Sequence, residues 1–257
     1  MSANLIALIT GYTGESGKAL LKELIKSNQF KKIILVGRRH VEYTDNEYKE
    51  KTLFFSYAND RQLIIFTITK EQRQIDFEKI DDYPEAFHGA DIHYCCLGTT
   101  RGKSGAEGFR HVDFDFVVGA ARLAKQEGCK HFHLVSSQGA DPYSLFLYNK
   151  VKGQAETALT QMSFERLSIY RPAMLMVHRT ENRPLESFAQ TVIHNTVERI
   201  APEWITTPIE VLARAMCFNT FTKDRPSIEI LDNHAIFRLA EQQPFQTKEL
   251  SQATNAS

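Results

Sequence analysis

The chain has 257 residues, of which 42% are hydrophobic and 24% charged, the usual mixture of a folded, water-soluble domain. This length supplies one substantial core and does not require a second domain. Lysine plus arginine equals aspartate plus glutamate at 31 each, which argues against nucleic acid or an anionic membrane as a partner attracted by overall charge.

Cysteines and apolar runs narrow the class of protein further. The four cysteines form no C-x-x-C pair, so we expect reduced, buried thiols in a cytoplasmic protein; redox sensing is the alternative, with no motif behind it. They are Cys95, Cys96, Cys129 and Cys217. The first apolar run, 5–9, is too short for a signal-peptide core or a membrane span, so we expect no integral membrane segment.

The N-terminal elements predict a βαβ unit. Residues 5–9 form a continuous apolar run that ends before a glycine-rich loop, as in a strand buried on both faces. Apolar residues recur at helical spacing over 16–28, and 32–37 reads as a second buried strand. Strand, glycine turn, helix and strand within about forty residues are typical of a right-handed crossover.

The stretch 52–70 interrupts this alternation. Two β-like runs, 52–55 and 63–68, flank the turn residues Ala58-Asn59-Asp60, which predicts a hairpin. The hairpin delays a third strand that we expect near 74–76. We therefore treat 52–70 as an insertion into the fold.

The remaining chain continues the alternation of strands and helices. We expect strands at 91–97, 131–136, 165–170 and 228–231. We expect helices at 108–127, 145–162, 208–221 and 234–242. This order predicts an α/β fold with a doubly wound parallel sheet, the NAD(P)-binding Rossmann fold. A single domain would span 1–245, with small substrate-side elements at 173–245 and a disordered polar tail at 246–257.

The glycine loop predicts a dinucleotide phosphate site. Its pattern is G-x-x-G-x-x-G, with glycines at 11, 14 and 17, and the match is weak by spacing alone. Its context strengthens it, because the loop follows a strand and opens a helix whose N-terminus attracts anions. A glycine turn without a ligand is the alternative. The residues of the loop that we expect at a nicotinamide dinucleotide are Gly11, Thr13, Gly14, Glu15, Ser16 and Gly17.

The end of the second strand favours NADPH over NADH. An NAD site places an acid about twenty residues after the loop, where it accepts a hydrogen bond from the ribose. This chain has Gly37-Arg38-Arg39 there instead. Two guanidinium groups suit a 2′-phosphate, and solvated surface arginines are the alternative. Asp76, after the expected third strand, is a candidate acceptor for the adenine amino group.

A tyrosine and a lysine four residues apart form the candidate reactive pair. Tyr148 and Lys152 lie on one face of a predicted helix, after a strand that ends at Ser136-Ser137. A phenol with a pKa near 10 becomes an effective acid or base at neutral pH when an ammonium group stabilises the phenolate. We expect Tyr148 to exchange a proton with the substrate oxygen, and Ser137, or Ser136, to orient that oxygen.

Other groups of reactive residues give weaker evidence for a metal site or for another class of enzyme. His131 and His133 share a strand face but lack a nearby third ligand, so packing is favoured over zinc and we expect no metal. The acidic group Asp81, Asp82 and Glu85 reads as a solvated helix start. No G-x-S-x-G motif occurs, which argues against a serine hydrolase.

Longer runs carry a resemblance to a known family. They are 14–17, 35–39, 76–83, 95–103, 105–109, 128–132, 136–137, 139–141, 146–148, 151–153, 170–172 and 183–184. With the glycine loop and the Tyr148/Lys152 pair, they make the chain resemble the short-chain dehydrogenase/reductase superfamily in its atypical branch. More closely, the chain resembles the Tat-interactive protein family, the oxidoreductase-like tumour suppressors. Most of the chain is covered.

The resemblance implies an NADPH-bound Rossmann fold with a defined set of contacts. Arg38 and Arg39 would lie at the 2′-phosphate, and Thr13, Gly14, Glu15 and Ser16 at the pyrophosphate. Further contacts would come from Leu97, Gly98, Tyr148, Lys152, Leu175 and Arg183. Tyr148 would be the proton acceptor of the family.

The resemblance also implies a regulatory role. Members of the family are described as promoting apoptosis, restraining translation through an elongation factor, competing for nuclear import receptors and sensing redox state. A nuclear or nuclear-envelope location would then accompany the cytoplasmic one. The alternative is a metabolic NADPH-dependent reductase of a small carbonyl compound that uses Tyr148 and Lys152.

Two departures from the family bear on these expectations. The first strand is reached by Leu5, whereas vertebrate members carry a longer N-terminal arm used in partner binding, which puts the elongation-factor contact in doubt. The stretch 52–70 has no counterpart in the family. We expect it to be either a lineage-specific hairpin or retained intronic sequence.

Overall fold

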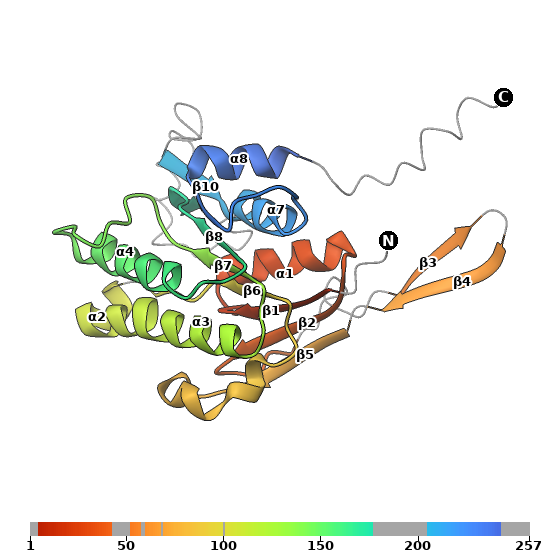
Figure 1. The fold of residues 1–257 in the computed structure, drawn as a ribbon, viewed down its shortest axis with the longest axis horizontal. Helices are drawn as coiled ribbons and strands as arrows, with labels where there is room; N and C mark the ends of the chain where they lie inside the picture. Colours follow the sequence, from red (N-terminus) through yellow and green to blue (C-terminus); the bar gives the residue numbers. More distant parts are fainter. Residues whose placement is uncertain are drawn as a thin grey trace, which may run out of the picture.

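The computed structural model describes residues 5–42, 52–57, 60–67, 69–99, 101–176 and 205–242. The strands of its main sheet are β1 (Leu5–Thr10), β2 (Phe30–Gly37), β5 (Thr69–Gln74), β6 (Ile92–Cys95), β7 (His131–Val135), β8 (Arg166–Tyr170) and β11 (Ile228–Leu231). They lie in the order β11-β8-β7-β6-β1-β2-β5, and every neighbouring pair is parallel. The predicted doubly wound Rossmann fold is confirmed (Figure 1).

Helices cover both faces of the sheet (Figure 1). One face packs against α1 (Glu15–Ser27), α7 (Ile209–Asn219) and α8 (Asn233–Glu241). The other packs against α3 (Val117–Gln126), α4 (Leu147–Thr160) and the short 3-10 helices η2 (Phe77–Asp82) and η3 (Pro84–Phe87). Among the described residues, no helix is both long and apolar enough to cross a bilayer.

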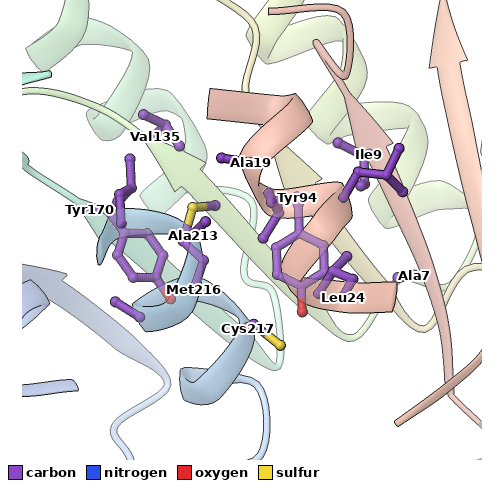
Figure 2. Packing of buried hydrophobic residues seen from close by; sticks show 14 of the residues in the cluster. Ala7, Ile9, Ala19, Leu24, Tyr94, Val135, Tyr170, Ala213, Met216 and Cys217 are labelled. Carbon is purple, nitrogen blue, oxygen red and sulfur yellow. The ribbon is translucent and has the colours of Figure 1, made fainter. Parts of the chain in front are cut away.

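The strand periodicity divides the apolar side chains between two cores. Ala7 and Ile9 of β1 point to the α1 side, where Figure 2 shows them near Leu24, while Leu8 points to the opposite core. These three side chains, Ala7, Leu8 and Ile9, are fully buried. A strand with helices on both faces therefore reads as a continuous apolar run, and each buried leucine or isoleucine contributes roughly 1.5–3 kcal/mol.

The third strand is where the sequence-based expectation was wrong. We expected it near 74–76, but β5 ends at Gln74 and pairs with β2 from Lys32↔Thr69 to Gly37↔Gln74. β5 is an edge strand with polar, half-exposed side chains, so no apolar run marks it. The last two residues of the stretch 52–70 therefore belong to the sheet.

The predicted hairpin is present. β3 (Thr52–Tyr57) and β4 (Asp60–Thr67) pair antiparallel in a sheet of their own, in register Leu53↔Phe66 and Phe55↔Ile64. Its origin as a lineage-specific insertion or as retained intronic sequence stays a prediction, as do the limits of the domain. The tail 246–257 lies outside the described residues.

The helix expected at 108–127 starts earlier and has three parts. α2 (Arg101–Arg110) contains a kink at Gly105, where φ is 71°, and a π-helical segment η4 (His111–Phe116) leads into α3. The glycines at 102, 105 and 108 lower helix propensity, which hid the true start. A small parallel pair, β9 (Met174–Met176) with β10 (Thr206–Pro208), was also not predicted.

Candidate functional site

From β1 the main sheet grows outward through β2 to β5, and the chain then crosses back to β6 on the other side of β1. The strand order therefore reverses at β1, and open α/β sheets bind ligands at such a switch point, at the carboxyl ends of the strands. The glycine loop follows β1 there. Gly11 has φ of +77° and approaches the segment after β6 so closely that a Cβ atom would lie 2.4 Å from the carbonyl carbon of Cys96. Only glycine fits this backbone and this contact.

The other two glycines set how α1 leaves the loop. A Cβ atom on Gly17 would lie 2.3 Å from the Gly11 carbonyl oxygen, so this glycine lets the first turn of α1 pack directly on the loop. Gly14 is the N-cap residue and supplies no side-chain cap. The first backbone N–H groups of α1 therefore remain available to an anion, next to the positive end of the helix dipole.

Glu15 and Ser16 open α1, as the sequence predicts for the phosphate end. The Glu15 carboxylate is half-exposed and lies 3.0 Å from the Lys18 ammonium. This neighbouring cation offsets a negative charge that would otherwise oppose a pyrophosphate. Thr13 lies half-buried in the loop, and Gly14 N–H closes its turn by donating to the Gly11 carbonyl at 3.1 Å.

Arg38 and Arg39 follow β2 directly, and both are exposed. Among the described residues, neither guanidinium has a hydrogen-bond or ion-pair partner. The backbone at this point passes under the Tyr12 ring, since a Cβ atom on Gly37 would lie 2.7 Å from Tyr12 Cε1. The glycine loop and the arginine pair, separated in sequence, are thus joined through Tyr12.

A buried ion pair lies beneath the segment that follows β6. Lys152 Nζ is 2.8 Å from Asp113 Oδ1, and the two side chains are 9% and 1% exposed. Asp113 Oδ2 accepts a hydrogen bond from Thr99 N–H at 2.8 Å. A Cβ atom on Gly98 would lie 3.3 Å from Asp113 Oδ1, so Gly98 lies against this pair, and the half-buried Leu97 precedes it.

Asp113 was missed by sequence reasoning. It lies in the π-helical segment η4 on the same face as the buried Phe109, Phe116 and Val117. A carboxylate in the apolar phase of a helix was the signal that could have found it, because buried acids require a partner.

The Asp113 carboxylate keeps Lys152 charged. Burial by itself would lower the pKa of the lysine, but the attraction of Asp113, helped by Tyr148 and Cys95, outweighs it and raises the pKa above its usual value. Tyr148 lies one turn before Lys152 on α4, as predicted, and its ring stacks on Phe109 with centroids 5.4 Å apart. Its side chain is 45% exposed, which leaves the phenol accessible from solvent.

The two candidate serines have different partners. Ser136 Oγ donates to Glu156 Oε1 at 2.5 Å, and Glu156 also accepts two hydrogen bonds from Arg171. Ser137 Oγ is buried and has no hydrogen-bond partner among the described residues. Ser137 is free of such a partner, and its loop is bonded to α4, where Asp141 N–H donates to the Asn149 carbonyl at 3.0 Å, so Ser137 rather than Ser136 is the candidate.

The remaining predicted positions are less informative. Leu175 lies on β9, half-buried against the α1-side core. Arg183 falls outside the described residues. No group of three metal-ligating side chains occurs in the described part of the chain. His131 and His133 are buried and hydrogen-bonded to Ser168 and Tyr170, as packing residues.

No protein-family model matches the chain. Among curated proteins it is 40% identical to Protein HTATIP2 of Rattus norvegicus over 236 residues, which cover 92% of this chain and 89% of that protein. It is 33% identical to Protein FMP52, mitochondrial, of Candida albicans, covering 72% of this chain and 73% of the relative.

Solved structures with the same fold are more distant. MoeE5 in complex with UDP-glucose and NAD matches with a TM-score of 0.60 and 14% identity, over 88% of this chain and 75% of that one. UDP-glucose 4-epimerase of Thermotoga maritima matches with a TM-score of 0.60 and 14% identity, over 95% and 85%. At this identity the likeness shows the fold alone, whereas the likeness to Protein HTATIP2 extends over nearly all of both chains. The chain belongs to the Tat-interactive protein family, to which Protein HTATIP2 gives its name, within the atypical short-chain dehydrogenases/reductases.

Proposed function

We propose that this protein is an NADPH-dependent oxidoreductase that reduces a carbonyl compound. The observation that carries the proposal is the convergence, at one edge of the sheet, of an uncapped helix N-terminus, two arginines without a partner in the described part of the chain, and the Tyr148–Lys152–Ser137 group. Gly11 and Gly17 support the proposal through the tight turn that brings the N-terminus of α1 to this edge, because Cβ atoms on them would clash with neighbouring backbone atoms. MoeE5, a solved structure of the same fold, is a complex with UDP-glucose and NAD, which supports the cofactor class.

Each end of the site would hold one part of the cofactor. The N–H groups that open α1 would bind the pyrophosphate, and the exposed guanidinium groups of Arg38 and Arg39 would bind a 2′-phosphate through charge-assisted hydrogen bonds. An NADH ribose would leave both cations unpaired. Lys152, whose ammonium lies beside Gly98, would reach the nicotinamide ribose.

The chain's own residues would then manage a proton. A bound nicotinamide dinucleotide supplies hydride to the carbonyl carbon, and the carbonyl oxygen must take up a proton as its charge develops. Tyr148 would donate that proton from its exposed hydroxyl, while Ser137 Oγ would donate a hydrogen bond to the same oxygen. Lys152 would stabilise the resulting phenolate through its positive charge.

Replacement of Tyr148 by Phe tests the proposal. We expect Tyr148→Phe to reduce NADPH oxidation at 340 nm by at least about 100-fold, since proton transfer contributes on that order, and to leave the Kd for NADPH unchanged within a factor of about two. Tyr143→Phe is the matched control, because Tyr143 lies in the same segment and is 90% exposed. A Tyr148→Phe variant that turned over like the wild type would refute the assigned role.

A second candidate function is regulatory: an NADPH-binding module that reports to protein partners. The Lys152–Asp113 pair favours it, because the carboxylate neutralises the ammonium that would activate Tyr148. Exposed apolar side chains also border Tyr148, namely Tyr143, Leu145 and Phe146. NADPH binding without turnover of any compound in a carbonyl panel would favour this candidate in the same experiment.

Apoptosis, translation and nuclear import remain functions suggested by the family, and import receptors or an elongation factor remain the corresponding partners. The location in cytoplasm and nucleus also stays a prediction. The fungal relatives are named mitochondrial, so mitochondria enter as a further compartment to test by imaging of the tagged protein.

A further inference from the structure

The segment 38–42, which carries both arginines, has no regular secondary structure and yet is held along its length. Three side chains from other elements bond its backbone. Gln74 Nε2 donates to the Arg38 carbonyl at 3.1 Å, and the Tyr12 hydroxyl donates to the Arg39 carbonyl at 2.5 Å. A third side chain, Gln72, bonds the segment further along at Val41.

Gln72 binds Val41 as a neighbouring strand would. Its Oε1 accepts from Val41 N–H at 2.9 Å, and its Nε2 donates to the Val41 carbonyl at 2.8 Å. A primary amide that uses both its donor and its acceptor on one residue fixes that peptide in position and in orientation. Gln72 and Gln74 are two apart on β5 and therefore point to the same side of the strand.

Tyr12 couples this segment to the phosphate loop. The side chain arises between Gly11 and Gly14, is 1% exposed and packs its ring on Gly37. Its hydroxyl also lies 3.2 Å from Gln72 Oε1, so the single hydroxyl proton of Tyr12 is shared between the Arg39 carbonyl oxygen and Gln72 Oε1. Burial raises the pKa of Tyr12, despite the opposing charge of Arg39, and the hydroxyl stays a donor at neutral pH.

We propose that Tyr12 and Gln72 determine cofactor specificity by holding the segment 38–42 so that both arginines are presented to the 2′-phosphate of NADPH. They would act through the backbone of this segment, with no contact to the cofactor, and are positioning residues. The inference rests on the proposed NADPH function and deepens it.

The physical reason is preorganisation. An arginine side chain loses rotamer entropy when it is fixed, and a mobile backbone would add to that cost for both guanidiniums. Only NADPH has the phosphate that these guanidiniums bind. Loosening the segment should therefore weaken NADPH and leave NADH almost unchanged, which a general loss of stability would not do.

The experiment measures the Kd of NADPH and of NADH for the full chain by titration of cofactor fluorescence. Tyr12→Phe keeps the ring on Gly37 and removes one hydroxyl, and Gln72→Leu keeps the side-chain volume and removes the amide. We expect each variant to raise the NADPH Kd about 5- to 10-fold, since Tyr12→Phe removes two hydrogen bonds and Gln72→Leu removes three, and to change the NADH Kd less than about twofold. Gln126→Leu, at the exposed end of α3, is the matched control.

Two additions keep the test decisive. Gln74→Ala changes an exposed residue, so folding is not at risk, and it should raise the NADPH Kd about 2- to 3-fold. Because the Tyr12 hydroxyl donates to Gln72 Oε1, both single variants remove this bond, and the double variant should lose less than the product of the two single effects.

The outcomes separate the two proposals. The preference for NADPH is the Kd of NADH divided by the Kd of NADPH. A wild type that prefers NADPH, with the same preference in all three variants, would overturn this inference and leave the proposed function standing. A wild type with no preference for NADPH would overturn the NADPH proposal and this inference with it. A preference for NADPH that falls in the three variants and not in Gln126→Leu supports both the NADPH proposal and this inference.

Discussion

Lys152 shows how one residue acquires a different partner in the fold from the one its sequence neighbours suggest. The spacing to Tyr148 predicted a lysine that serves the phenol, and α4 does place the two one turn apart. Its ammonium, however, forms an ion pair with Asp113, 39 residues earlier on η4. Lys152 therefore lies beside Tyr148 on α4 as one half of a buried ion pair.

Substitution of Asp113 by Asn should be strongly destabilising. The amide keeps an acceptor for Thr99 N–H but leaves the Lys152 ammonium buried without a counter-charge, which costs about 3–5 kcal/mol. The folded-state pKa of Lys152 is raised in the native protein, so this stabilisation is complete below the unfolded pKa near 10.4 and is lost as pH rises through the folded pKa.

Urea unfolding at pH 7 measures this effect. The double variant Asp113→Asn/Lys152→Met should recover part of the lost free energy, because no buried charge remains. The pKa of Lys152 in Asp113→Asn, followed by NMR of the labelled side chain, should fall below its native value. A single variant that lost less than about 1 kcal/mol would contradict the assignment of the pair as a coupled buried unit.

At the scale of elements, the join between β1 and α1 is the part of the fold that was predicted most completely. The glycine spacing indicated both the tight turn and the open helix N-terminus, and both are present. The three glycines are nevertheless unequal. A Cβ atom added to Gly11 or Gly17 would lie 2.4 or 2.3 Å from a backbone atom, whereas one added to Gly14 would lie 3.4 Å from its nearest neighbour.

Gly17→Ala and Gly14→Ala should therefore differ in stability. The first forces a methyl group into the Gly11 carbonyl, and overpacking of this kind costs roughly 1–3 kcal/mol or more. The second adds a methyl group at ordinary contact distance with φ of −79°, and should change the free energy of unfolding by less than about 1 kcal/mol. Thermal unfolding without cofactor compares them, and equal midpoints would show that the close packing of α1 on the loop is not required.

β5 illustrates an element that the sequence did not reveal. Its residues are Thr-Lys-Glu-Gln-Arg-Gln, without apolar periodicity, because one edge of the strand has no neighbour in the main sheet. The strand is held by backbone pairing with β2 and by ion pairs of Glu71 with Lys32 and Arg73. Its position is set by pairing with a distant strand, which a local pattern does not record.

At the scale of the whole molecule, a polar layer crosses the otherwise apolar sheet. His93 lies 2.9 Å from Thr10 Oγ1, and His131 and His133 bond Ser168 and Tyr170. Each of the three imidazoles is buried. Burial lowers the pKa of His93 and that of His131 to about 3, with Arg166 adding to the effect at His131. Burial, with repulsion of positive charge by His131, Arg166 and His93, lowers the pKa of His133 well below 6.5.

Acid should therefore unfold the protein before its carboxylates titrate. The folded pKa values lie below the unfolded value of 6.5, so the unfolded chain takes up protons first and stability falls as pH drops below about 6.5. Between pH 7 and 5, each histidine should remove on the order of 1–2 kcal/mol. Exposed His111, whose pKa Glu78 and Asp115 raise, acts in the opposite direction.

Urea unfolding at pH 7 and pH 5 tests this. His93→Phe, which fits beside Phe87 and Phe132, should lose about one third of the pH dependence. If the free energy of unfolding were the same at both pH values, the buried histidines would have to be charged in the native state.

What the sequence determined by itself is local or periodic. The apolar runs of β1 and β2, the helical phase of α1 and α4, and the glycine loop follow from interactions within a few residues, and all were predicted. The tertiary structure alone decided which distant groups meet. It brought Asp113 to Lys152 and Glu156 to Ser136, and it left Ser137 without a partner among the described residues. It also bonded the backbone of Arg38, Arg39 and Val41 to the side chains of Gln74, Tyr12 and Gln72, respectively. These pairings depend on strand order and helix packing, which bring together residues dozens of positions apart, and no local spacing encodes that geometry.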